Sequence, residues 1–216
     1  LGIGVTHRVV SEGVFAIPYA GSVIRCRDEL VVLRGLLGPD RAADYDGPTL
    51  STHAKLANPT PAPRLVVAAL GPRMLELAGE FADGTVTWMT GPRALGRDVV
   101  PHLRRAAAEY QEIDPEVVVG LPVCVTDDVA DARRRLGAAM AGAAALPSYR
   151  RMLAAEGVGE PVDIALVGTE EAVAERVEEL AAAGGTELLA NVSGTAEEQD
   201  RTRALLSRLA GEGRGA

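Results

Sequence analysis

Aromatic residues are scarce in this sequence, at 3% of its 216 residues, and cysteine occurs only twice, as Cys26 and Cys124. The two cysteines lie far apart in apolar runs and show no metal-ligand spacing, so we expect free thiols buried as small hydrophobic groups. A structural disulfide is not expected, and a reducing cytoplasm is the predicted location. With few aromatic rings, the core must be built from aliphatic side chains on helices and strands.

Long apolar runs and clustered positive charge are also absent. No apolar run approaches the roughly 20 residues that cross a bilayer, so we expect no membrane partner. The net charge is −8, whereas nucleic-acid surfaces need clustered Lys and Arg, so we expect no nucleic-acid partner. The three histidines, His7, His53 and His102, are scattered, and their spacing predicts no metal site.

Two common catalytic motifs are missing as well. Gly2-Ile3-Gly4 lacks the third glycine of the dinucleotide-binding fingerprint, and no acidic residue ends a second strand about 20 residues on. Ser148 and Ser193 lack a nucleophile-elbow context, which gives a hydrolase little support. The chain also has no turn or cap before the strand-like residues 1–5, and from this we expect a chain truncated at its N-terminus.

The sequence does have a regular alternation of extended and helical patterns. Strands are predicted at residues 1–5, 65–70, 85–89, 117–125 and 187–192, mostly as the continuous apolar runs of a parallel sheet covered on both faces. Apolar stripes such as Leu30, Leu33 and Leu37 predict helices between them. The alternation favours a doubly wound sheet or a closed barrel, and because no linker divides residues 1–216 we expect one domain.

Local signals mark where several helices begin. Gly71-Pro72 places proline at a first helical position, where its missing N–H costs nothing. Asp127 and Asp128 predict a cap for the helix after residue 125, and Thr169 predicts the cap of the following helix.

Two stretches interrupt the alternation. Residues 39–63 contain five prolines and predict a long excursion between a helix and the next strand, which makes them a candidate lid. Residues 144–163 predict an extra helical insertion. Long ordered loops in a regular α/β chain are more often functional than not.

Chemistry is expected at the carboxyl ends of the strands, where both architectures place their ligands. Leu70-Gly71-Pro72 and Thr90-Gly91-Pro92 each put a glycine between a strand and a helix start, where backbone N–H groups and the helix dipole favour an anion. Thr90 adds a hydroxyl group and Arg73 a positive charge. The two turns fit either a phosphate cradle or ordinary loop glycines.

His7 and Trp88 are the other candidates at these ends. His7 is the only histidine at a predicted strand end, where it would orient a substrate or exchange a proton, with a plain loop histidine as the alternative. Trp88 alternates with Met89 on one strand, so one of the two points inward and would form an apolar wall against a flat ring.

Three segments together resemble a known family. They are residues 1–5 (LGIGV), 68–74 (AALGPRM) and 78–92 (AGEFADGTVTWMTGP), and the A-G-x-x-A-D-G run is their most specific part. They resemble the bacterial luciferase-like superfamily and, within it, oxidoreductases that use the deazaflavin coenzyme F420. The resemblance extends essentially end to end. It implies an α/β fold, a (β/α)8 TIM barrel entered at its fourth strand, with strands 4 to 8 and their helices present.

The resemblance also implies where the cofactor binds. In the superfamily the turns after the fifth and sixth strands bind the cofactor phosphate, and the end of the fourth strand faces the ring or the substrate. The corresponding residues here are Leu70, Gly71 and Arg73, then Thr90 and Gly91, and finally Thr6 and His7.

Three functions follow as hypotheses. The first is an F420-dependent oxidoreductase that moves a hydride between reduced F420 and a small organic substrate. The second is a monooxygenase that receives reduced FMN from a partner reductase. The third is a truncated, non-catalytic protein that binds ligands or assembles. Because open sheet edges invite association, we also expect a homo-oligomer.

Overall fold

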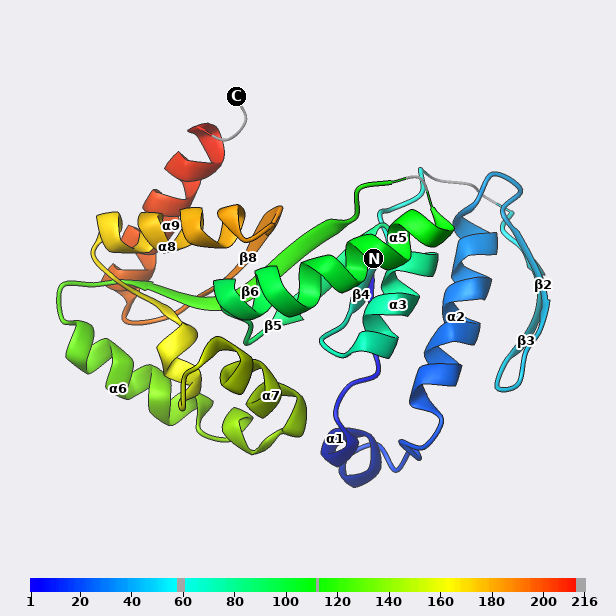
Figure 1. The fold of residues 1–216 in the computed structure, drawn as a ribbon, viewed down its shortest axis with the longest axis horizontal. Helices are drawn as coiled ribbons and strands as arrows, with labels where there is room; N and C mark the ends of the chain where they lie inside the picture. Colours follow the sequence, from blue (N-terminus) through cyan, green and yellow to red (C-terminus); the bar gives the residue numbers. More distant parts are fainter. Residues whose placement is uncertain (58–60, 112, 213–216) are drawn as a thin grey trace. The chain divides into compact units, whose positions relative to one another are not determined.

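The computed structural model describes residues 1–57, 61–111 and 113–212. The chain forms two compact units, one made of Leu1–Val86 with His102–Glu116 and the other of Thr87–Pro101 with Val117–Ala216. Helices and strands alternate along the chain, as expected from the sequence (Figure 1).

The first unit is built on parallel strands. In it β1 (Gly2–Ile3) pairs with β4 (Val66–Ala68), and β4 pairs in the same direction with the beginning of β5 (Gly84–Trp88). Its helices are α1 (Arg8–Gly13), α2 (Ser22–Leu37), α3 (Pro72–Phe81) and most of α5 (Val100–Tyr110). Leu30, Leu65 and Val67 are fully buried, so the core is aliphatic, as predicted.

The second unit is also a parallel arrangement, centred on the long strand β6 (Glu116–Val125). β8 (Glu187–Val192) pairs with residues 118–123 of β6, and the short β7 (Leu166–Gly168) pairs with residues 123–125. The remaining elements are α4 (Pro92–Ala94), the π-helical η1 (Leu95–Val99), α6 (Val129–Met140), the 3-10 turns η2 (Ala143–Ala145) and η3 (Pro161–Ile164), α7 (Pro147–Glu156), α8 (Glu170–Ala182) and α9 (Ala196–Glu212).

All five predicted strands are present, with shifted ends. β6 is buried along nearly its whole length, which explains its continuous apolar run. β1 ends at Ile3, and Thr6 just beyond it has a φ of +49°, a backbone conformation that no extended strand contains. The prediction of a strand over residues 1–5 was therefore too long. β7 was not predicted, because its three residues are too short to show a period.

The predicted helix starts are confirmed. Asp128 caps α6 by accepting a hydrogen bond from the amide of Asp131 at 3.0 Å, and Thr169 caps α8 through the amide of Ala172 at 3.4 Å. Pro72 and Pro92 stand in the first turns of α3 and α4. These features depend only on neighbouring residues, which is why the sequence was sufficient to locate them.

The first predicted excursion contains an antiparallel hairpin of β2 (Ala42–Asp46) and β3 (Ser51–Lys55), which lies beside α2 (Figure 1). The buried Asp28 of α2 holds it: its carboxylate accepts hydrogen bonds from the Tyr45 hydroxyl at 2.8 Å and from the Thr49 amide and hydroxyl at 2.8 and 2.6 Å. Burial alone would raise the pKa of Asp28, but these donors lower it. Pro59, part of the same predicted excursion, lies outside the described residues.

The second predicted insertion is helical, with α7 at its centre and the turns η2 and η3 on either side. Both cysteines are buried and free, as expected. Burial and the nearby Glu29 carboxylate raise the pKa of Cys26 to about 11, so this thiol stays protonated at neutral pH. Within the described part of the chain, none of the helices combines the length and apolar character needed to span a bilayer.

Candidate functional site

In the first unit Thr6 follows β1 and Leu70 follows β4, and these two strands are parallel neighbours. Both residues therefore come after the carboxyl ends of the strands. Thr6 has a positive φ, which is an outlier for a β-branched residue and the kind of strain that collects at functional positions. A cavity of about 160 Å³ lies next to it, lined by Gly4, Val5, Thr6, Ser11, Phe15, Ile17, Pro18, Ser22, Arg25, Cys26 and Glu29. Ligand pockets are typically 300–1,000 Å³, so this cavity has room for only part of a ring-sized ligand.

His7 directly follows Thr6 and begins helix α1. Its carbonyl oxygen accepts hydrogen bonds from the amides of Val10 and Ser11, both at 2.9 Å, and its side chain is half-buried. Because β1 ends at Ile3, His7 lies at the start of α1 and not at the strand end where it was predicted. Its role as the catalytic residue stays a prediction.

The backbone of the turn after β4 has an ordinary geometry. Gly71 has a φ of −101°, which any residue can adopt, and its carbonyl accepts the amides of Met74 and Leu75 at 3.0 and 2.9 Å. Arg73 is exposed on the first turn of α3, where its charge can reach a ligand from solvent. Phosphate binding by Leu70, Gly71 and Arg73 stays a prediction.

The turn after β5 is buried and strained. Met89 has a φ of +59° and is 1% exposed, while Thr90 is fully buried. Trp88 is half-buried, and a Cβ on Gly120 would lie 2.8 Å from its ring. Of the Trp88–Met89 pair, Met89 is thus the more deeply buried, and the indole ring packs over a glycine.

A side-chain carboxylate of the same chain binds to this turn. The Glu156 carboxylate, at the end of α7, accepts hydrogen bonds from the amide of Ala94 at 2.8 Å and from the amide of Arg93 at 3.3 Å. A Cβ on Gly91 would lie 2.4 Å from the carboxyl carbon of Glu156. The turn around Gly91 therefore binds a carboxylate of the chain itself, and phosphate binding by Thr90 and Gly91 stays a prediction.

Two arginines interact with Glu156. The Arg93 guanidinium lies 3.5 Å from the main-chain oxygen of Glu156. Hydrogen bonding and charge from Asp98 raise the pKa of Arg97, and the charge of Glu156 adds to this shift. Sequence reasoning missed Glu156, because nothing local to the insertion at 144–163 shows that its last helix reaches a turn 62 residues earlier.

Near the carboxyl ends of β6 and β8, acidic and basic side chains pair with one another. Glu198 accepts the Thr195 amide at 2.6 Å and the Arg135 guanidinium at 2.8 Å. Burial opposes its ionisation, but these hydrogen bonds and one from the Thr126 hydroxyl lower the pKa of Glu198 to about 2. Arg201 similarly joins Asp127 to Glu170. These paired charges tie helices to strand ends.

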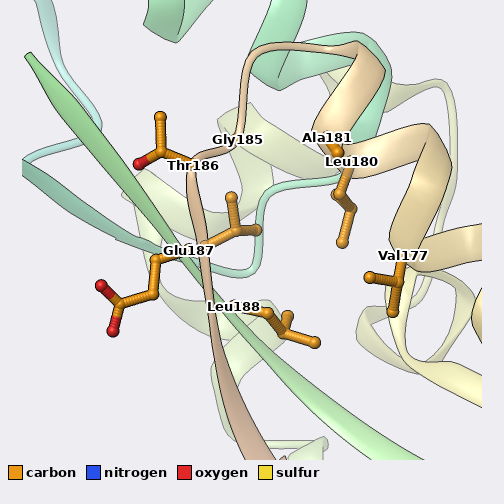
Figure 2. Close-up of a pocket in the computed structure, with 8 residues that line it drawn as sticks. Val177, Leu180, Ala181, Gly185, Thr186, Glu187 and Leu188 are labelled. Atoms are coloured by element: carbon orange, nitrogen blue, oxygen red, sulfur yellow. The ribbon is translucent and has the colours of Figure 1, made fainter. Parts of the chain in front are cut away.

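A second, apolar cavity of about 110 Å³ lies between α8 and the beginning of β8. Figure 2 shows the residues that line it: Val119, Val177, Leu180, Ala181, Gly185, Thr186, Glu187 and Leu188. It is near the amino end of β8, whereas ligands of parallel α/β folds bind at the carboxyl ends. Its size and position are those of a packing gap. No group of three or more metal-binding side chains gathers in the described ranges.

Residues 1–187 match the family described as Luciferase-like monooxygenase. The chain belongs to this family. A curated relative, the uncharacterized protein Rv1360 of Mycobacterium tuberculosis, is 30% identical over 181 residues, which are 74% of this chain and 52% of the relative. The chain thus spans about half the length of the curated relatives it matches.

Solved structures support the same fold. An F420-dependent secondary alcohol dehydrogenase, solved with an F420-acetone adduct, superposes with a TM-score of 0.75 at 17% identity over 94% of this chain and 66% of that one. The coenzyme F420-dependent tetrahydromethanopterin reductase of Methanopyrus kandleri gives 0.73 at 18% identity over 94% and 70%. The predicted α/β fold of the luciferase-like barrel is therefore confirmed over the part of the barrel that this chain spans.

Proposed function

We propose that this protein is a luciferase-like oxidoreductase that moves a hydride between coenzyme F420 and a small organic substrate. The observation that carries the proposal is the turn after β5, where Gly91 and the amides of Arg93 and Ala94 hold a carboxylate. Family membership supports an oxidoreductase, and the F420 dependence of two structural neighbours supports the choice of cofactor.

We expect the phosphate of such a cofactor to bind at this turn in place of the Glu156 carboxylate. Its amides already donate hydrogen bonds to the Glu156 carboxylate, which fills the space beside Gly91, and Arg93 contributes positive charge close by. For the first unit, phosphate binding by Leu70, Gly71 and Arg73 at the turn after β4 is a separate part of the proposal. The deazaflavin ring supplies the hydride when it is bound.

This chain's own residues would orient the reactants and exclude water. The buried Met89 and Thr90 keep solvent away from the turn after β5. Thr6, held in a strained conformation beside the cavity at the end of β1, would position the ring or the substrate. His7 next to it would exchange a proton with the substrate oxygen.

A monooxygenase that uses reduced FMN from a partner reductase is the second candidate. The description of the matching family favours it, and FMN also carries a phosphate that the same turn would accept. In either case we expect a homo-oligomer that acts on a small organic molecule.

Titration of the protein with F420 and with FMN, followed by fluorescence, tests the choice between them. We expect saturable F420 binding and a weaker response to FMN. Tight binding of FMN without binding of F420 would replace the first candidate with the second, and oxygen uptake with reduced FMN and a substrate panel would then identify a monooxygenase.

A further inference from the structure

The cavity of about 160 Å³ after β1 is lined by two opposite charges as well as by apolar side chains. The charged residues are Arg25 and Glu29 of α2, and both are half-buried. They lie four residues apart, so their side chains extend from the same face of the helix. Side chains of opposite charge at this spacing are close enough to form an ion pair.

These two side chains do not pair. Within the described ranges, neither the Arg25 guanidinium nor the Glu29 carboxylate takes part in an ion pair or a side-chain hydrogen bond. Their order along α2 contributes to this, because such a pair is more stable when the glutamate precedes the basic residue, whereas here Arg25 comes first. The cavity therefore offers a positive and a negative charge to a molecule that enters it.

The backbone around the cavity is held in an uncommon conformation. Thr6 has a φ of +49°, and Ala16, which directly follows the lining residue Phe15, has a φ of +54°. The Ser11 hydroxyl donates a hydrogen bond to the carbonyl oxygen of Ile17 at 2.8 Å, so the segment after α1 is tied back to that helix. Such backbone conformations are costly for residues other than glycine, and they cluster at ligand sites.

We propose that this cavity binds a small zwitterion, with its carboxylate on Arg25 and its ammonium group on Glu29. A zwitterion matches both charges, whereas a simple anion leaves Glu29 without a counter-charge and a simple cation leaves Arg25 without one. The Cys26 thiol in the lining stays protonated, because burial and the Glu29 carboxylate raise its pKa to about 11. The lining thus carries no net charge, as a zwitterion requires.

The size of the cavity fits the charged end of a small amino acid. Because a water molecule occupies about 30 Å³ of the liquid, the cavity holds roughly five or six atoms other than hydrogen. The proposal rests on the function proposed above, since it assigns the charged end of that reaction's organic substrate to this cavity.

The test uses β-alanine as the probe, with propionate and n-propylamine as matched ions that carry only one of its two charges. Binding to the native protein is followed through the amide signals of Ser11 and Cys26 in nitrogen-15 NMR spectra at neutral pH. We expect β-alanine to bind saturably and each of the two ions to bind about tenfold more weakly or less. Absence of saturable β-alanine binding, or equally tight binding of either ion, would overturn the proposal.

Variants of the two charged residues identify the site. Arg25→Gln and Glu29→Gln should each weaken β-alanine binding by about tenfold or more, whereas Arg25→Lys and Glu29→Asp should retain it within about threefold because they keep the charges. Arg105→Gln and Glu76→Gln are the matched controls, since they remove the same charges from exposed residues outside the lining and should leave binding unchanged. The melting curve of each variant checks that it folds. Neutral variants that bind as tightly as the native protein would contradict the assignment.

Cofactor titrations separate this proposal from the proposed function. If neither F420 nor FMN binds while β-alanine binding responds to Arg25→Gln as expected, the function fails and the zwitterion site stands. If F420 binds and β-alanine does not, the function stands and the zwitterion site fails.

Discussion

At the scale of single residues, position 91 excludes a side chain because of the atoms around it and not because of its backbone conformation. Its φ of −82° is open to any residue, yet a Cβ there would lie 2.4 Å from the Glu156 carboxyl group. That obstructing group is the end of a flexible side chain, which can move at little cost. A ligand anion on the neighbouring amides would have no such freedom, so we expect Gly91 to matter more to ligand binding than to folding.

We expect Gly91→Val to weaken F420 binding at least tenfold, or about 1.4 kcal/mol, while the free energy of unfolding changes by less than about 1 kcal/mol. Fluorescence titration and urea unfolding measure the two quantities. Gly96→Ala is the control, since its Cβ would lie 3.5 Å from the nearest atom, so neither the affinity nor the stability should fall. Equal losses of affinity and stability in Gly91→Val would make the turn an ordinary loop.

At the scale of elements, the A-G-x-x-A-D-G segment that carries the family resemblance is explained by packing. A Cβ on Gly79 of α3 would lie 2.7 Å from the amide nitrogen of Ala107 on α5, so the two helices approach closely there. The Asp83 carboxylate accepts the amide of Leu65 at 2.6 Å and pairs with Arg34 at 3.1 Å. The most specific motif of the sequence thus packs α3 against its neighbours. None of the residues proposed to bind the cofactor belongs to this motif.

We expect Gly79→Ala to destabilise the protein by about 1–3 kcal/mol, because the backbone of α5 must shift to admit a methyl group. Thermal unfolding should show the midpoint falling by several degrees. Gly137→Ala on α6 is a suitable comparison, since its nearest neighbour would be 3.9 Å away and alanine favours a helix by up to about 1 kcal/mol. A Gly79→Ala protein as stable as the native one would refute the close approach.

At the scale of the whole molecule, apolar side chains near the beginning of the chain face solvent. Val9, Val14 and Phe15 are 63%, 70% and 61% exposed, although they are the residue types that proteins usually bury. Exposed apolar surface of this kind favours association between chains. The predicted self-association can therefore be tested by substitutions at these residues.

We expect the 216-residue chain to be oligomeric or poorly soluble at micromolar concentration, measured by size-exclusion chromatography with light scattering. The double variant Val14→Ser with Phe15→Ser should shift the distribution toward monomer, because it removes apolar surface. Leu56→Ser, at a residue 42% exposed elsewhere in the same unit, should have a smaller effect. A monodisperse native monomer that melts cooperatively would contradict this prediction.

The sequence was sufficient wherever structure follows from neighbouring residues. The apolar run that became β6, the cap at Asp128 and the proline at the start of α3 each depend on a few adjacent positions, and each was predicted. β7 was missed because three residues show no period, and the hairpin of β2 and β3 because it is held by Asp28 of α2, at least 17 residues earlier in the chain.

The sequence by itself determined the alternation of strands and helices, the aliphatic core and the starts of the helices that follow Gly71 and Gly91. Only the tertiary structure decided that Glu156 lies at one of those helix starts. The contact joins residues 62 and 63 positions apart, and each end of it looks ordinary in its local sequence. Hydrogen bonds between a helix end and a distant turn arise from how elements pack, and no pattern along the chain records that packing.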